Sequence, residues 1–293
     1  MKKNNQKSYI RRRLRLFWRR NYALPIALLL VFGLYFYMLK IEPNQLRITQ
    51  WTFSAASVPP ELDNFRIAFA ADIHLNNRQL KHLPAITGTL NALQADLILL
   101  GGDYVNGNGR GPGIKELMPF LEKLSAPCGV FAIPGNHEYK RGIKEIKHAF
   151  ADSHIQLLLD NNVKISAPGG GKFNLVGLDY HNNPHKRQNS ERFIRLIKRD
   201  MFNLVLAHTP EEFDFLPPDT DLTLAGHTHG GQIAIPFMGS IINPPRYGRK
   251  YTYGAVYKNN RTMFITAGLG SAYTQARLCM KPEIVVITLK HSN

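Results

Sequence analysis

The sequence predicts a layered α/β fold with two packed sheets, preceded by one helix that crosses a membrane. From about residue 65 onward, short apolar runs of strand length alternate with longer segments of helical period. The second half of the chain holds more strand-like runs than one sheet comfortably accommodates. Near the N-terminus, 18 consecutive residues carry no charge. No fixed-period repeat or low-complexity tract interrupts this pattern.

The N-terminal segment combines a basic flank with an apolar stretch. Nine Lys and Arg residues precede Tyr22, and residues 22–39 read YALPIALLLVFGLYFYML. As a helix this stretch spans roughly 27 Å at about 1.5 Å per residue, close to the hydrocarbon thickness of a bilayer. Lys40 follows directly, without a small-residue cleavage site. We therefore expect residues 22–39 to form an uncleaved transmembrane anchor rather than a removed signal peptide.

The basic flank also predicts the orientation of the chain. Basic residues beside a membrane span remain in the cytoplasm, which places residues 1–21 there as a cytoplasmic N-terminus. The body of the chain, residues 44–293, is then expected on the non-cytoplasmic side of the cell membrane, held by a single pass. Adjacent arginines in IRRRLRLF are also compatible with twin-arginine export.

Charge outside the anchor is moderately positive. The first 43 residues hold 10 Lys and Arg and one acidic residue, which leaves 27 basic and 20 acidic residues, a net charge of +7, in the remainder. This excess favours anionic partners. The basic residues are scattered, however, and the densest cluster adjoins the predicted anchor, where anionic headgroups would meet it. We therefore expect a membrane and no nucleic acid as partner.

The two cysteines limit the redox and metal chemistry of the chain. Cys128 and Cys279 are too few to build a cysteine zinc site. Their spacing leaves two alternatives open, a pair of free thiols or a single disulfide.

The body opens with a strand at residues 46–53, where polar residues alternate, and a proline turn at residues 57–60. Four segments have apolar residues at helical spacing and predict helices: residues 79–94, 114–124, 143–151 and 191–198. In the second half, further apolar runs predict strands at residues 155–159, 163–167, 173–178, 232–235, 251–257, 263–267 and 284–289.

Five strand-like runs end in Asp, Asn or His. The residues that follow them are Asp72 and His74 after 66–71, Asp103 after 97–100, Asn136 and His137 after 130–133, His208 after 203–207, and His227 and His229 after 222–225. Because the carboxyl ends of neighbouring strands open onto one crevice, these side chains are expected to converge. Such oxygen and nitrogen donors suit divalent Mn, Fe or Zn, and their number suits two ions that share a carboxylate. Glycines beside them, Gly101, Gly102, Gly135 and Gly226, allow tight turns.

These blocks resemble those of the calcineurin-like metallophosphoesterases. The matching motifs are Asp72-x-His74, Gly102-Asp103, Gly135-Asn136-His137-Glu138, His208 and Gly226-His227-x-His229, all in order. Surrounding sequences such as PPELDNFRIAFAADIHL and AGHTHGGQIAIP resemble the bacterial membrane-anchored or exported branch. The resemblance implies a four-layer α/β/β/α sandwich of two mixed sheets for residues 44–293, after one N-terminal transmembrane helix.

The resemblance also implies the roles of the individual residues. One metal would bind Asp72, His74, Asp103 and His229, and the second would bind Asp103, Asn136, His208 and His227. A hydroxide bridging the two ions would attack phosphorus. His137 would stay off the metals as a catalytic residue that protonates the leaving oxygen or stabilises the transition state. Glu138 would either orient His137 or lie solvated at a helix start.

Three further residues are candidates for substrate contact. Arg246 and Arg277 lie near the ligand blocks in sequence, and a guanidinium group suits a phosphate oxygen. His181 follows a strand that ends close to the same crevice.

The expected function is therefore hydrolysis of a phosphodiester, phosphomonoester or pyrophosphate bond, on an envelope lipid or a cell-surface phosphate compound. One alternative is a UDP-2,3-diacylglucosamine pyrophosphohydrolase of lipid A biosynthesis, which needs a cytoplasmic active site. An alternative of another class is a non-catalytic envelope binding module. Such a module has no chemical need for His137 beside seven metal-ligand candidates.

Overall fold

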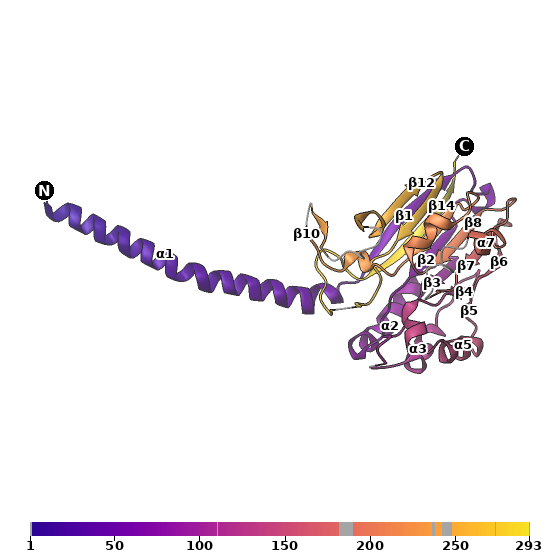
Figure 1. Cartoon of the computed structure of the whole chain (residues 1–293), viewed down its shortest axis with the longest axis horizontal. Coiled ribbons are helices and arrows are strands. Elements are labelled where there is room, and N and C mark those ends of the chain that lie inside the picture. The colour runs from indigo at the N-terminus through magenta and orange to yellow at the C-terminus, as the bar shows by residue number, and fades with distance from the viewer. Residues whose placement is uncertain are drawn as a thin grey trace.

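The computed structural model describes residues 2–109, 111–181, 190–235, 238–241, 248–272 and 274–292. A long N-terminal helix, α1 (Lys2–Phe36), projects from a body in which two sheets stack against each other (Figure 1). A π-helical turn, η1 (Tyr37–Ile41), and a 3-10 turn, η2 (Glu42–Asn44), connect α1 to the body. Between Tyr22 and Asn44 this segment is long and apolar enough to cross a membrane, and its apolar window is not buried. The predicted helix at residues 22–39 is thus confirmed.

The first sheet has six strands in the order β1-β14-β2-β3-β4-β5. Its strands are β1 (Arg47–Ala55), β14 (Glu283–His291), β2 (Arg66–Ala70), β3 (Leu97–Leu100), β4 (Val130–Ala132) and β5 (Gln156–Leu157). The sheet is mixed, because β14 runs antiparallel to β2 while the other neighbours are parallel. Its outer face is covered by α2 (Asn77–Ala92), α3 (Ile114–Leu121) and α5 (Ile143–Ala151).

The second sheet also has six strands, in the order β12-β13-β9-β8-β7-β6. Its strands are β12 (Gly254–Lys258), β13 (Arg261–Ile265), β9 (Leu222–Ala225), β8 (Asn203–Ala207), β7 (Lys172–Gly177) and β6 (Asn161–Ser166). The inner pairs are parallel and both edge strands are antiparallel. The outer face packs against the short helix α7 (Ser190–Ile194) and the 3-10 helix η4 (Pro210–Phe215).

Aromatic side chains fill the space between the two sheets. Phe53 and Phe69 from the first sheet meet Phe173, Phe202 and Phe264 on the second sheet's side. Full burial of one such ring contributes about 1.5–3 kcal/mol. The four-layer α/β/β/α sandwich of two mixed sheets is therefore confirmed. The core between the sheets keeps the strand ends of one sheet close to those of the other.

Local differences from the sequence prediction have simple causes. The six-residue helix α4 (Asn136–Arg141) was not predicted because it is too short to show a helical period. The strand expected at residues 251–257 starts at Gly254, since the 3-10 helix η6 (Gly248–Tyr251) occupies the preceding residues. Small elements complete the fold: η3 (Pro60–Leu62), η5 (His229–Gly231), β10 (Ala234–Ile235) and β11 (Gly239–Ser240). Cys128 and Cys279 are both free thiols.

Candidate metal centre

The polar residues that follow the strands converge where strands of the two sheets end. Loops after β2, β3 and β4 bring Asp72, His74, Asp103 and Asn136, and loops after β8 and β9 bring His208, His227 and His229. Three overlapping groups could each hold a metal ion: Asp72 with His74 and His229; His74 with Asp103 and His137; and Asp103 with His208 and His227. The predicted convergence therefore occurs, and Asp103 belongs to two of the groups.

At the cluster, the backbone adopts a left-handed conformation that residues other than glycine rarely adopt. Positive φ angles occur at Asp72 (56°), His74 (44°), Asp103 (53°), His227 (70°) and His229 (54°). Each non-glycine residue in this left-handed region costs about 1–3 kcal/mol. Strain of this kind persists only where the surrounding fold enforces it, so three loops are held in a shape that aims side chains at one point.

Close backbone approach explains the glycines beside the cluster. A Cβ atom on Gly226 would lie 2.6 Å from Oδ2 of Asp72, and one on Gly135 would collide with Oδ1 of Asp103. The predicted need for glycine at these two turns is confirmed. Any larger residue would displace a carboxylate of the cluster.

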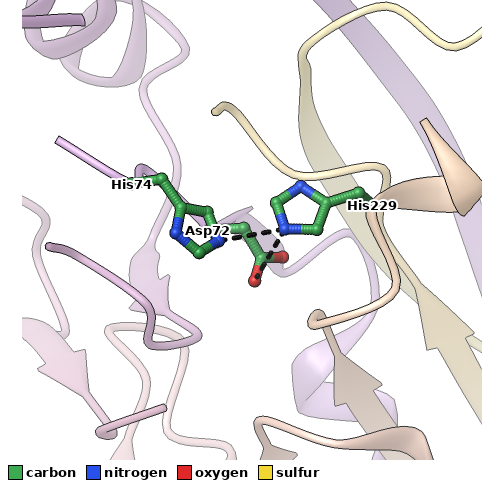
Figure 2. A group of neighbouring side chains, drawn as sticks. All are labelled: Asp72, His74 and His229. Carbon is green, nitrogen blue, oxygen red and sulfur yellow. Dashed lines mark hydrogen bonds and ion pairs between the residues drawn. The ribbon is translucent and has the colours of Figure 1, made fainter. Parts of the chain in front are cut away.

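Figure 2 shows the part of the cluster formed by Asp72, His74 and His229. The two imidazoles approach each other with 3.0 Å between their Nε2 atoms, and Nε2 of His229 lies 4.0 Å from Oδ1 of Asp72. The carboxylate of Asp72 accepts the backbone N–H of His227 at 3.0 Å on both oxygens. The Nδ1 atoms of His74 and His229 are buried and have no hydrogen-bond partner among the described residues.

The other part is organised around His208. Its Nε2 lies 3.1 Å from Oδ1 of Asn136, 3.2 Å from Nδ1 of His227 and 3.3 Å from Oδ2 of Asp103. Its Nδ1 lies 2.8 Å from the carbonyl oxygen of Gly101 and donates to it. The hydrogen bond to the carbonyl fixes the ring plane and leaves Nε2 directed at the cluster.

Asp103 connects the two parts. One carboxylate oxygen, Oδ2, lies 3.4 Å from Nε2 of His74 and 3.3 Å from Nε2 of His208. The other, Oδ1, accepts the backbone N–H of His137 at 2.8 Å. The side chain is almost fully buried. One carboxylate thus faces both groups of imidazoles.

The donor set fits divalent cations. With the Nδ1 proton of His208 donated to a carbonyl, its Nε2 faces the oxygens of Asp103 and Asn136, which are themselves acceptors, so a proton on Nε2 or a bound cation must lie between them. Lone pairs gathered in this way repel one another unless positive charge lies among them. The unpartnered ring nitrogens of His74 and His229 show that hydrogen bonds within the protein do not complete this region.

The electrostatics of the cluster show the same demand for positive charge. Burial acts to lower the pKa of His208, but the charge of Asp103 and the hydrogen bond to it raise that pKa to about 10. Burial acts upward on Asp103, yet the charge of His208 and the same hydrogen bond hold its pKa well below the usual value. By contrast, burial raises the pKa of Asp72 to about 7 and lowers that of His74 to about 3.

His137 stands at the edge of the cluster with a defined proton position. The backbone N–H of Gly107 donates to its Nδ1 at 2.9 Å, so the neutral ring carries its proton on Nε2. That Nε2 lies 4.0 Å from Oδ2 of Asp103. Burial lowers the pKa of His137. The arrangement gives the cluster one partly exposed N–H donor.

Glu138 has a role that the sequence does not reveal. Its carboxylate is fully buried and accepts four backbone N–H groups, those of Gly135, Asp103, Tyr104 and Val105. Burial raises its pKa to about 7, although these N–H groups favour the ionised form. Of the two predicted alternatives, the solvated position at a helix start does not occur. Instead, Glu138 joins the loop after β3 to the loop after β4 and fixes the backbone of Asp103 by accepting its N–H.

The three candidates for substrate contact have different places. Arg277 is fully buried, and its guanidinium donates to the carbonyl oxygens of Ala267, Gly268 and Met280 at 2.8–3.0 Å. These bonds assign it to the packing of a loop, which differs from the predicted contact with substrate. The predicted contact at Arg246 lies outside the described residues.

His181 is paired with a carboxylate beside the cluster. Its Nε2 lies 2.9 Å from Oδ2 of Asp160, which also pairs with Arg192. The preceding residue, Tyr180, packs edge-on against His208 with 6.2 Å between ring centroids. Sequence reasoning singled out this segment through His181 but missed Tyr180, because a lone tyrosine after a strand carries no chemical signal.

Two stacked mixed sheets with such a cluster at their strand ends define a class of protein, the metal-dependent phosphoester hydrolases. The family model described as calcineurin-like phosphoesterase matches residues 65–231 of the chain. The chain belongs to this family. The resemblance seen in the sequence is thereby confirmed, and the alternative of a non-catalytic envelope module is set aside.

Individual relatives agree with the family assignment. The "Uncharacterized metallophosphoesterase YkuE" of Bacillus subtilis is 31% identical over 92% of this chain and 95% of its own length. "Phosphodiesterase YaeI" of Escherichia coli is 30% identical over 77% of this chain and 82% of its own. "UDP-2,3-diacylglucosamine pyrophosphatase LpxG" of Chlamydia trachomatis is 23% identical over 84% of this chain and 90% of its own.

Proposed function

We propose that the chain is a two-metal phosphohydrolase held at a membrane by residues 22–39. The observation that carries this proposal is the position of Asp103, whose carboxylate oxygen Oδ2 faces His74 on one side and His208 on the other. One ion is assigned to Asp72, His74, Asp103 and His229, and the other to Asp103, Asn136, His208 and His227. When bound, two divalent ions acidify a water molecule and stabilise charge that develops on a phosphoryl group.

The protein's own groups act around that charge. Asp103 holds the two sets of imidazoles at a common point, and Glu138 fixes the backbone on which Asp103 is carried. His137 Nε2–H is placed to protonate the departing oxygen of the substrate, because Gly107 keeps the proton off Nδ1. Tyr180 closes one side of the cluster beside His208.

The substrate is proposed to be a phosphodiester, phosphomonoester or pyrophosphate on an envelope lipid or a cell-surface phosphate compound. The names of two relatives, a phosphodiesterase and a UDP-2,3-diacylglucosamine pyrophosphatase, support this range of bonds. The basic flank before Tyr22 supports a cytoplasmic N-terminus and a body on the other side of the membrane. A body on the cytoplasmic side would favour the UDP-2,3-diacylglucosamine alternative.

The test is a substrate panel with the full chain in lipid. An aryl phosphodiester, an aryl phosphomonoester and a nucleoside-diphosphate-sugar lipid are offered with Mn²⁺ or Zn²⁺, with and without a chelator. We expect metal-dependent hydrolysis of at least one of the three, abolished by the chelator. Hydrolysis that continues in the chelator, or none in any metal, contradicts the proposal.

A further inference from the structure

The C-terminal end of the anchor is held to the body by hydrogen bonds and is not joined to it by a flexible linker. The backbone carbonyl of Met38 accepts the N–H of Arg277 at 3.0 Å, and that of Leu39 accepts Nη1 of Arg78 at 2.9 Å. Glu42 is 1% exposed and accepts the N–H of Met280 at 2.7 Å. These bonds fix the direction in which α1 leaves the body, and with it the face of the body that lies nearest the anchor.

The segment that holds the anchor also contacts the metal centre. Arg277 bonds the carbonyl groups of residues 267–268, and in the same loop Gly270 donates its N–H to the carbonyl of Asp72 at 2.6 Å. On its other side, Leu278 exchanges hydrogen bonds with Gln232 and Ala234 at 3.0 and 2.8 Å. The anchor end, the loop of a metal-ligand candidate and the start of β10 are therefore joined through one segment.

A small hairpin with exposed apolar side chains lies beside this junction. In it, β10 pairs antiparallel with β11, and Ala234 faces Ser240. Met238 is 59% exposed and Ile241 is 60% exposed. In Figure 1, β10 lies on the side of the body from which α1 projects. Exposed apolar side chains in this position extend the apolar surface of the anchor onto the body.

The charges near the junction match a lipid surface. Lys40 is exposed directly after the apolar stretch. Arg78, which bonds the carbonyl of Leu39, and Lys281, which follows the residue that bonds Glu42, are both partly exposed. Cations at the end of an apolar span lie at the level of anionic headgroups. Apolar side chains flanked by cations are typical of surfaces that enter the boundary between headgroups and acyl chains.

We propose that Met238 and Ile241 insert into the bilayer that α1 crosses, so that the metal centre opens at the lipid surface and acts on a phosphoester carried by a lipid. This inference rests on the membrane anchor and the phosphohydrolase activity proposed above. The hairpin begins at Ala234, five residues after the metal-ligand candidate His229 and three residues after the end of η5. A hairpin seated in the membrane therefore limits the distance between the cluster and the headgroups.

The first test measures the depth of single positions in the bilayer. The full chain, with Cys128 and Cys279 replaced by Ser, is labelled with an environment-sensitive fluorophore after Met238→Cys or Ile241→Cys and reconstituted in vesicles of neutral and anionic phospholipid. Brominated acyl chains are expected to quench both labels at least about twofold. Tyr257→Cys serves as the control, because Tyr257 is 70% exposed near the end of β12 that lies away from the cluster.

A label at Leu30→Cys separates the two proposals. Quenching at position 30 without quenching at positions 238 and 241 overturns the hairpin contact while the anchor stands. Absence of quenching at position 30 overturns both, since the hairpin contact requires the anchor to be in the membrane.

The second test compares one reacting group in two settings. An aryl phosphodiester with an acyl chain is offered in vesicles, and the same aryl phosphodiester is offered free in solution. Met238→Glu combined with Ile241→Glu is expected to lower the ratio of vesicle to solution rates about tenfold, while Tyr257→Glu keeps the wild-type ratio. An unchanged ratio in the double variant overturns the inference. If the phosphodiester is not hydrolysed in either setting, the comparison is made with the member of the substrate panel that the wild type hydrolyses; hydrolysis of no member contradicts the phosphohydrolase and the inference with it.

Discussion

The two parts of the metal centre differ in how their imidazole rings are held. His208 donates Nδ1–H to the carbonyl of Gly101, so its ring is oriented by a hydrogen bond within the protein. His74 and His229 have buried Nδ1 atoms without a partner among the described residues, so no comparable outer hydrogen bond orients their rings. Outer hydrogen bonds orient ligands and raise their basicity before an ion arrives. The His208 part is therefore preorganised, and the other part depends more on its ion.

Replacement of the shared carboxylate should remove the difference between the two parts. Asp103→Asn leaves neither ion a charged bridging group, so the loss of metal affinity should exceed the roughly 100-fold that loss of an outer partner causes. Metal content by mass spectrometry should fall in both positions, and nearly all hydrolysis should disappear. Two ions per chain with near-normal turnover would show that Asp103 is not the bridge.

Removal of the proton donor should leave both parts loaded. His137→Ala takes away Nε2–H without removing an assigned ligand, and a positioned proton donor typically contributes on the order of 100-fold. Turnover should fall by about that factor while metal content stays at the wild-type value. If the variant loses metal in proportion to its rate, His137 is a ligand instead.

Loss of the buried carboxylate behind Asp103 should weaken metal binding without removing a ligand. Glu138→Gln keeps the shape of the side chain but replaces one oxygen that accepts backbone N–H groups with a donor. We expect metal affinity to fall about 10- to 100-fold, as for other outer partners. The His208 part should be affected more, because Glu138 also holds Gly135, the residue before Asn136. If calorimetric titration gives the variant the metal affinity of the wild type, Glu138 acts only as a helix cap and does not support the metal centre.

The smallest expected effect is the difference between the two parts in the wild-type protein. Stepwise removal of metal with a chelator should first empty the Asp72, His74 and His229 part, at an affinity about tenfold weaker than the other. Paired measurements on His229→Ala and His208→Ala assign the two steps, because each variant should lack one of them. A single step in the wild type, or the reverse order, would show that the hydrogen bond to Gly101 does not set the affinities.

The cluster could be predicted from the sequence because each member follows a recognisable apolar strand. The positions of Asp72, Asp103 and His208 relative to their strands are local features. The rule that the carboxyl ends of neighbouring strands open onto one crevice then predicts that these side chains converge. The assignment of each residue to one ion or the other stays a prediction. The same local reasoning predicted the apolar helix at residues 22–39, whose crossing of a membrane also stays a prediction.

What the sequence could not reveal depends on contacts between distant segments. The carboxylate of Glu138 finds N–H groups more than 30 residues away, and the guanidinium of Arg277 is enclosed by carbonyl groups of its own folded loop. The left-handed backbone at five cluster residues likewise follows from the packing of the two sheets, because Asp and His carry only a weak preference for that region. Each of these features requires the folded chain.

The most direct test of the central claim is an anomalous diffraction map of the full chain crystallised with Mn²⁺. The account predicts two peaks, one on each side of the Asp103 carboxylate. The first should be within bonding distance of Asp72, His74 and His229, and the second within bonding distance of Asn136, His208 and His227. A single peak, or two peaks of which only one touches Asp103, would contradict a shared carboxylate and the two-metal phosphohydrolase built on it.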